Sequence, residues 1–200
     1  MSSTERLSLP EQRTLLQVAR NSIRHGLASG TPLRVNAREF PSALQPPRAT
    51  FVTLHRAGDL RGCIGTLTAT RPLVEDVAWH AFAAAFEDPR FPPVHESEME
   101  QLDIEISILS PAEALAAASE EELLGKLRVG IDGLILQQGP RRATFLPSVW
   151  EQLANPREFL AHLKLKAGLP PDYWSDTLRF ERYVTTSFGD AHEDPRAREA

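Results

Sequence analysis

The sequence has a single cysteine among 200 residues, and no apolar run approaches the roughly 20 residues that a membrane-spanning helix needs. One cysteine cannot form an internal disulfide, which excludes a disulfide-stapled scaffold and fits a reducing cytoplasm. The first residues, Met1–Arg6, lack the charged and then apolar pattern of a signal segment. We therefore expect a cytoplasmic protein without a membrane partner.

Several motifs that carry chemistry are also missing. The chain has no glycine-rich phosphate loop and no nucleophile elbow, and its six histidines lack metal-ligand spacing. The 22 basic and 27 acidic residues give a formal net charge of −5, which argues against a broad phosphate-binding surface. The aromatic residues sit at core-type spacing and do not interleave with basic ones. We predict no metal and no cofactor, and we do not expect a nucleic-acid partner.

The residues that are present are typical of a globular protein, with 42% hydrophobic and 24% charged residues. Ser8 and Glu11 have the spacing of a capping box, which predicts a helix over 10–28. Asn155 is a cap that predicts a helix over 156–167. Further helices are expected over 71–87, with Thr70 as its cap, over 119–124, and as a short turn after Pro147.

Strands are predicted where β-branched or alternating residues occur. Residues 103–109 alternate isoleucine with polar residues, which is typical of a sheet with one buried face. Residues 50–55 and 60–67 are expected to pair as a hairpin. The other expected strands are 127–131 and 134–138, paired around Asp132–Gly133, then 143–146 and 178–185.

These helices and strands do not alternate regularly along the chain. The predicted fold class is therefore α+β, with a mainly antiparallel sheet flanked by helices. Residues 32–48 are rich in proline and are expected to form an ordered surface loop. Residues 189–200 are polar without an apolar anchor and are expected to form a disordered tail.

The segment of greatest chemical interest is Arg61–Gly65, in which Gly62 and Gly65 flank Cys63. Glycine is useful where a ligand or a second backbone must come close. Arg61 and Cys63 share a face of the strand by its period of two, and a nearby guanidinium favours the thiolate. One interpretation is a reactive or ligand-contacting thiol in a glycine-lined notch. The other is a small buried side chain beside a bulge.

Two other segments contain charged candidates. Asp88 and Arg90 lie in a rigid proline-rich loop, where Arg90 could bind an anionic ligand through its planar guanidinium. The same pair is also compatible with a simple helix stop anchored by Phe91. Glu105 shares a strand face with polar neighbours, which suits either an acid or base in a cleft or an outward-facing sheet surface.

The histidines offer two weaker hypotheses. His55 ends the strand expected to pair with that of Cys63, and it could act as a base if the register brought the two together. Asp76 and His80 lie four residues apart on one helix, where an exposed pair contributes only tenths of a kcal/mol.

The order of several motifs resembles the AMMECR domain, whose bacterial and archaeal members are called AmmeMemoRadiSam system protein A. The resemblance covers residues 10–188 and implies an α+β fold with a larger and a smaller subdomain around a cleft. The motifs that carry it are LRGCIGTL at 60–67, AAAFEDPRFPPV at 83–94, LDIEISILSP at 102–111, GIDGLILQQG at 130–139, TFLPSVWEQL at 144–153 and LKAGLPPDYW at 165–174.

Residue by residue, the family's main motif matches Leu60–Gly65, its second block matches Asp88, Arg90 and Phe91, and its third matches Glu105. The resemblance implies that these three segments converge on one pocket. The resulting candidates are Cys63 and Glu105 as catalytic residues, and Arg61, Gly62, Gly65, Asp88 and Arg90 as ligand-binding residues.

The family name implies two partners, a radical S-adenosylmethionine (radical SAM) protein and a Memo-type protein. An iron–sulfur cluster would belong to such a partner, because this chain lacks the cysteines to hold one. Two hypotheses follow. The protein is a small-molecule-binding component that acts with these partners and carries candidate catalytic residues, or it is a non-enzymatic adaptor that joins them. The sequence leaves open whether it is an enzyme.

Overall fold

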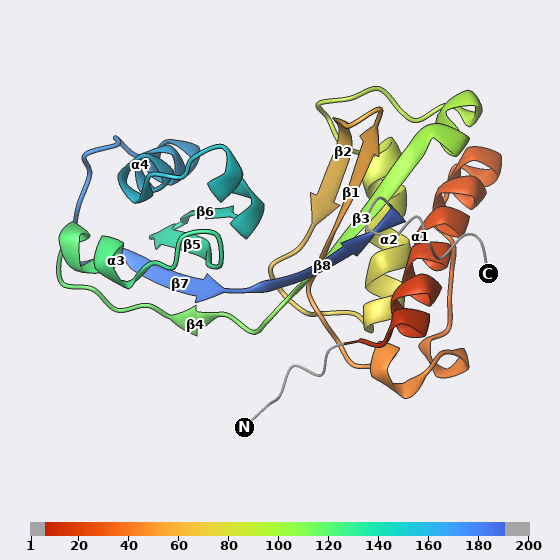
Figure 1. The fold of residues 1–200 in the computed structure, drawn as a ribbon, viewed down its shortest axis with the longest axis horizontal. Coiled ribbons are helices and arrows are strands. Elements are labelled where there is room, and N and C mark those ends of the chain that lie inside the picture. The colour runs from red at the N-terminus through yellow and green to blue at the C-terminus, as the bar shows by residue number, and fades with distance from the viewer. Residues whose placement is uncertain (1–6, 191–200) are drawn as a thin grey trace. The chain divides into compact units, whose positions relative to one another are not determined.

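The computed structural model describes residues 7–190, which form two compact α+β units (Figure 1). Unit 1 contains the described residues up to Leu109 and from Thr186 onward, and unit 2 contains Ser110–Thr185. Both sheets contain antiparallel strand pairs and are accompanied by helices, so the predicted fold class is confirmed. Within 7–190, no helix has both the length and the apolar character needed to cross a bilayer.

Unit 1 is a four-stranded sheet with two long helices packed against it. The strand order is β2-β1-β3-β8, and β1 pairs antiparallel with both β2 and β3. The elements are α1 (Leu9–Ser29), β1 (Thr50–Arg56), β2 (Asp59–Gly65), α2 (Leu73–Phe86), β3 (Leu102–Leu109) and β8 (Thr185–Gly189), with short 3₁₀ turns η1 (Ala37–Glu39), η2 (Ser42–Leu44) and η3 (Glu96–Gln101).

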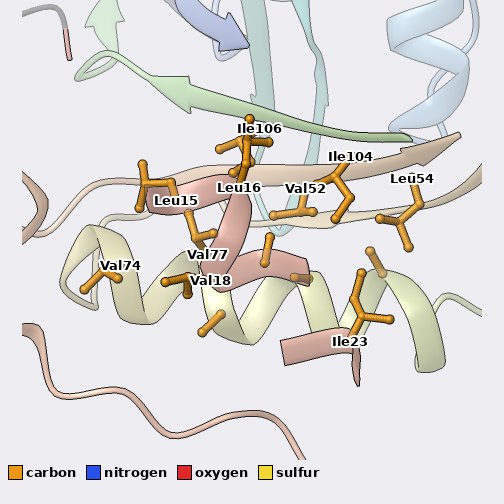
Figure 2. Close-up of a cluster of buried hydrophobic side chains, with 14 of the residues drawn as sticks. Leu15, Leu16, Val18, Ile23, Val52, Leu54, Val74, Val77, Ile104 and Ile106 are labelled. Carbon is orange, nitrogen blue, oxygen red and sulfur yellow. The ribbon is translucent and has the colours of Figure 1, made fainter. Parts of the chain in front are cut away.

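The core of unit 1 lies between α1, α2 and one face of the sheet (Figure 2). Val52 and Leu54 of β1 and Ile104 and Ile106 of β3 are buried there, as the alternating pattern predicts. The opposite face of the same strands therefore presents the intervening residues, and it is this face that contains the candidate site.

The helix ends agree with the sequence in one case and differ in the other. The capping box of Ser8 and Glu11 is formed, and α1 ends at Gly30, whose φ of 70° is left-handed. Thr70 does not cap α2, which makes that prediction wrong: Pro72 occupies the cap position without a side-chain hydrogen bond. The fixed φ of proline suits the start of a helix, so α2 begins only at Leu73.

Unit 2 has a smaller sheet in the order β4-β7-β5-β6, with its own core. Trp150 stacks on Phe159 with ring centroids 3.8 Å apart, and Asn155 caps the helix that carries Phe159. The elements are β4 (Glu113–Ala114), α3 (Glu120–Lys126), β5 (Gly133–Gln138), β6 (Arg141–Phe145), η4 (Pro147–Glu151), α4 (Pro156–Lys166) and β7 (Arg179–Tyr183).

One predicted hairpin of unit 2 is wrong. Residues 127–131 form a turn rather than a strand, because the buried carboxylate of Asp132 accepts hydrogen bonds from the backbone N–H and the guanidinium of Arg128. A side chain thus occupies the backbone donor that a strand partner would need. Gly139–Pro140 predicts a further turn that leads into 143–146, and this prediction is confirmed, since the turn joins β5 and β6 as a hairpin.

The C-terminal segment also differs from expectation. The strand predicted over 178–185 is two strands, β7 and β8, which belong to different sheets. Gly189 ends β8, and the carboxylate of Asp190 accepts hydrogen bonds from the guanidinium of Arg20 and the backbone N–H of Ile104. These two residues are therefore ordered, contrary to the predicted tail, and the rest of that prediction concerns residues outside the described range.

Candidate functional site

The candidate site begins with a row of side chains that crosses three strands. Thr53 of β1 lies opposite Cys63 of β2 on one side and opposite Glu105 of β3 on the other. Directly opposed residues of antiparallel strands project from the same face. Cys63, Thr53 and Glu105 therefore share the sheet face opposite α1 and α2, and all three are partly exposed.

The thiol of Cys63 is in contact with the middle member of this row. The hydroxyl of Thr53 donates a hydrogen bond to Sγ at 3.3 Å. Burial raises the pKa of the Cys63 thiol, which outweighs the opposing effects of the Thr53 hydrogen bond and the Arg90 charge, while Asp88 and Glu105 raise it further. The thiol is therefore protonated at neutral pH, contrary to the expectation that a guanidinium would make it a thiolate.

The backbone of Cys63 lies at the free edge of the sheet, because β2 is an outermost strand. The carboxylate of Asp88 accepts the N–H of Cys63 at 2.9 Å, and the guanidinium of Arg90 donates to its carbonyl oxygen at 3.3 Å. Asp88 and Arg90, from the loop after α2, thus form hydrogen bonds with the Cys63 N–H and C=O groups, which a neighbouring strand would otherwise pair.

Asp88 and Arg90 are also bound to each other through two parallel hydrogen bonds. Nε of Arg90 donates to Oδ1 of Asp88 at 2.9 Å, and an Nη atom donates to Oδ2 at 2.7 Å. The Arg90 guanidinium holds the pKa of the Asp88 carboxyl far below its usual range. The Asp88 side chain is buried, whereas that of Arg90 is 55% exposed. The buried Asp88 carboxylate therefore holds the Arg90 guanidinium in place at the surface.

Glu105 lies two strands away from Cys63, a separation of roughly 10 Å between strand axes. It is close enough for its charge to raise the pKa of the thiol, and no hydrogen bond joins the two side chains. Arg90, Cys63, Thr53 and Glu105 therefore follow one another across the sheet, with a cationic group at one end and a carboxylate at the other.

The structure brings the three predicted segments together but does not place Arg61 with the thiol. Two nitrogens of its guanidinium donate to the Glu98 carboxylate at 2.9 and 3.0 Å, and a third contact reaches the Pro93 carbonyl. This pairing and the burial of Glu98 leave the Arg61 side chain 12% exposed. Arg61 thus holds the segment that follows α2, while its buried Nη1 has no hydrogen-bond partner among the described residues, so its role in binding an anion stays a prediction.

The two glycines of the motif are surrounded by protein atoms. A Cβ on Gly62 would lie 2.1 Å from the Ala84 carbonyl oxygen, so Gly62 allows α2 to approach the sheet. A Cβ on Gly65 would lie 2.3 Å from the Phe51 ring. Glycine can allow either a ligand or another part of the chain to come close. At both positions the close neighbour is another part of the chain.

The histidine hypotheses are both corrected. His55 pairs with Leu60, and Thr53 takes the position opposite Cys63, so His55 is not placed as a base for the thiol. His80 is buried rather than exposed. The Thr50 hydroxyl donates to Asp76 at 2.7 Å and lies 3.1 Å from Nδ1 of His80, which links α2 to the start of β1.

Sequence reasoning missed Thr53, the residue that touches the thiol. The signal that could have found it is strand register, since only the pairing of β1 with β2 and β3 puts Thr53 between Cys63 and Glu105. In the part of the chain that the structure describes, no three histidine, cysteine or acidic side chains gather as a metal cluster.

Comparison with known proteins identifies the family. The AMMECR1 family model matches residues 16–188. A protein of Methanothermobacter thermautotrophicus is 39% identical over 190 residues, covering 94% of this chain and 97% of its own. The crystal structure of an uncharacterised protein of Pyrococcus horikoshii superposes with a TM-score of 0.85 at 36% identity, covering 95% of each chain. The chain whose edge strand carries this thiol therefore belongs to the AMMECR1 family.

Proposed function

We propose that the protein binds a small anionic molecule on the sheet face that carries Cys63, as a component of a pathway shared with a radical SAM protein and a Memo-type protein. Arg90 binds the anionic group, Glu105 accepts hydrogen bonds from the other end of the molecule, and Cys63 contacts it between them. The observation that carries the proposal is the half-exposed guanidinium of Arg90, fixed beside Cys63 by the buried carboxylate of Asp88.

This arrangement suits recognition of an oxyanion. Two hydrogen bonds from Nε and Nη2 to Asp88 already orient the guanidinium of Arg90, so little side-chain entropy is lost when an anion binds to its remaining Nη1 group. The roughly 10 Å between the strands of Cys63 and Glu105 matches the length of a metabolite rather than that of a polymer.

Cys63 and Glu105 remain the candidate catalytic residues. A protonated thiol is a poor nucleophile, so reaction at Cys63 requires a ligand that shifts its ionisation. A cationic or donor group that neutralises Glu105 would do this, because the Glu105 charge is one of the effects that keep the thiol protonated.

The single cysteine allows a direct test of the anion site. Iodoacetate and iodoacetamide alkylate the same thiol and differ in charge, and the ratio of their rates is independent of the thiol pKa. A unit charge about 4 Å away in water contributes about 1 kcal/mol, or roughly fivefold in rate. We expect Arg90→Gln to lower the iodoacetate-to-iodoacetamide ratio by about that factor, with Arg90→Lys between the two.

The matched control is Arg24→Gln, which removes an exposed arginine of α1 that pairs with Glu100. It should leave the ratio unchanged. An equal ratio in the wild type and Arg90→Gln would overturn the role of Arg90 as an anion anchor, and a thiol inert to both reagents in the native protein would overturn its contact with ligands.

A second candidate function, the adaptor, is favoured by one feature of unit 2. The turn at 128–132 exposes Val129 by 47% and Ile131 by 51%, although it is held firmly by the buried Asp132. A rigid turn that presents two apolar side chains suits protein docking.

Co-purification separates the two functions. The full-length tagged protein should capture a radical SAM or Memo-type protein if either partnership exists. Loss of that capture in the Val129→Ser/Ile131→Ser variant, with retention in Arg90→Gln, would favour the adaptor. A change in alkylation ratio with no captured partner would favour small-molecule binding alone.

A further inference from the structure

Unit 1 contains a cavity that is lined by none of the residues of the Cys63 site. It has a volume of about 640 Å³, within the usual range for ligand pockets. One wall consists of Glu75 and Trp79, four residues apart on one face of α2, and of Arg71, which lies two residues before the helix begins. The other wall is the irregular segment that follows α1. The lining residues are Thr31, Pro32, Leu33, Arg34, Val35, Arg71, Glu75 and Trp79.

Two guanidinium groups line this cavity, and they are held differently. Arg71 lies over the Trp79 ring at 4.6 Å from its centroid, and Nη1 is 3.9 Å from Oδ1 of Asp76. That oxygen is fully buried and has no hydrogen-bond partner among the described residues. Its negative charge therefore attracts the Nη1 group of Arg71. Arg71 keeps 42% of its side chain exposed toward solvent.

Arg34 is the cation without a counterion. It is exposed at the opposite wall and forms no ion pair or hydrogen bond with any residue of the described range. Glu75 also lines the cavity, and its Oε1 accepts the backbone N–H of Ala37, which ties α2 to η1. The cavity therefore contains two cations, one of them unpaired, beside a carboxylate with a second oxygen left for a ligand.

We propose that this cavity is a second ligand site, which binds a small oxyanion carrying a neighbouring hydroxyl group. Arg34 and Arg71 bind the carboxylate or phosphate, since guanidinium forks match both. Glu75 accepts a hydrogen bond from the hydroxyl group, which also offsets the repulsion between its charge and the anion. The Trp79 ring, 39% exposed, packs against the carbon skeleton.

The indole of Trp79 provides the measurement. Trp150 and Trp174 belong to the core of unit 2, so a ligand in this cavity changes mainly the emission of Trp79. Full-length protein is titrated at constant ionic strength with citrate as the carboxylate probe, and with glycerol 3-phosphate and inorganic phosphate as phosphate probes. We expect a saturable change with a hydroxyl-bearing probe, and its absence in Trp79→Phe.

The decisive variant is Arg34→Gln, because this side chain has no partner in the described structure whose loss would disturb the fold. It should weaken binding at least about tenfold, measured by calorimetry as well as fluorescence. The matched control is Arg38→Gln, a nearby exposed arginine that does not line the cavity, which should bind as the wild type does.

The two ligand classes are separated by the same titrations. Tighter binding of citrate assigns a hydroxycarboxylate, and tighter binding of glycerol 3-phosphate assigns a phosphate ester. Absence of saturable heat and fluorescence change for all three probes, or equal weakening by Arg34→Gln and Arg38→Gln, overturns the proposal. Neither outcome affects the Cys63 site, whose test uses alkylation rates.

Discussion

Unit 1 contains two buried aspartates whose surroundings differ in a way that separates a site from a scaffold. Asp88 lies at the edge of the sheet, and both of its oxygens accept hydrogen bonds from Arg90, which reaches solvent. Asp76 lies between α2 and β1, and its Oδ2 accepts from the buried Thr50 hydroxyl while Oδ1 has no hydrogen-bond partner.

The two carboxylates therefore have different structural roles. At Asp88, burial of the acid fixes a base that stays exposed, which is the arrangement a ligand can use. At Asp76, the groups around Oδ2, Thr50 and His80, are themselves buried, so this side of the carboxylate joins α2 to β1, whereas Oδ1 lies 3.9 Å from the partly exposed Arg71. A buried acid indicates a functional site when its partner is accessible, and not by its burial alone.

Removal of Asp76 should have the larger effect on stability. Asp76→Ala leaves the buried Thr50 hydroxyl without its acceptor and removes the carboxylate that lies 3.1 Å from Nδ1 of His80. We expect the free energy of unfolding to fall by about 3 kcal/mol in urea denaturation. The alkylation ratio of Cys63 should stay at its wild-type value.

The control for that measurement is Asp59→Ala, at an exposed position of β2. Its unfolding free energy should change by no more than about 0.5 kcal/mol. A loss of under about 1 kcal/mol in Asp76→Ala would contradict the structural role assigned to this network.

Asp88→Asn should combine a smaller loss of stability with a change at the thiol. The variant weakens charge-assisted bonds to Arg90 and to the Cys63 N–H, which together contribute about 2 kcal/mol. Because the pKa of Asp88 is lowered in the folded protein, its carboxylate stabilises the fold fully above the unfolded pKa of about 3.9, and this stabilisation declines as the pH falls from that value toward the lower pKa of the folded state.

The stability difference between wild type and Asp88→Asn should therefore be largest near neutral pH and shrink below about pH 4. Urea denaturation at pH 7 and pH 3 measures it, with the alkylation ratio recorded at pH 7. A difference that does not depend on pH would show that the ionised Asp88 carboxylate is not what stabilises the fold.

The sequence predicted most of unit 1 because local signals agree there with the packing. The Ser8 capping box set the start of α1, and the alternation in β3 assigned Ile104 and Ile106 to the core and Glu105 to the other face. The failures occur where a side chain replaces backbone pairing. Asp132 binds Arg128 and converts a predicted strand into a turn.

The site was predictable only in part for a similar reason. Cys63, Asp88, Arg90 and Glu105 were identified as candidates from residue type and resemblance, and the structure brings them together. Which charge each candidate meets depends on register and on long-range ion pairs. No local pattern could assign Arg61 to Glu98, a residue 37 positions away, rather than to the thiol.

Glu105→Gln should affect the thiol without a large loss of stability. The Glu105 charge raises the pKa of Cys63, so its removal lowers that pKa and increases the thiolate fraction at neutral pH. At the separation of about 10 Å, a unit charge in water contributes about 0.4 kcal/mol, so we expect the iodoacetamide rate at pH 7 to rise by about twofold. A rate equal to that of the wild type would show that Glu105 does not act on the thiol. The control is Asp59→Asn, at the exposed end of β2.

Thr53→Val should act on the thiol with the opposite sign. The Thr53 hydroxyl lowers the pKa of Cys63 through its hydrogen bond to Sγ, so its loss raises the pKa and slows alkylation. Because a hydrogen bond to sulfur is weak, we expect about a twofold fall in the iodoacetamide rate at pH 7. The pH profile of the rate is the measurement, since packing changes alter its plateau whereas a pKa change moves its midpoint. A midpoint that stays at the wild-type pH would mean that Thr53 orients the thiol without stabilising its ionised form, and burial would remain the main influence on the ionisation of Cys63.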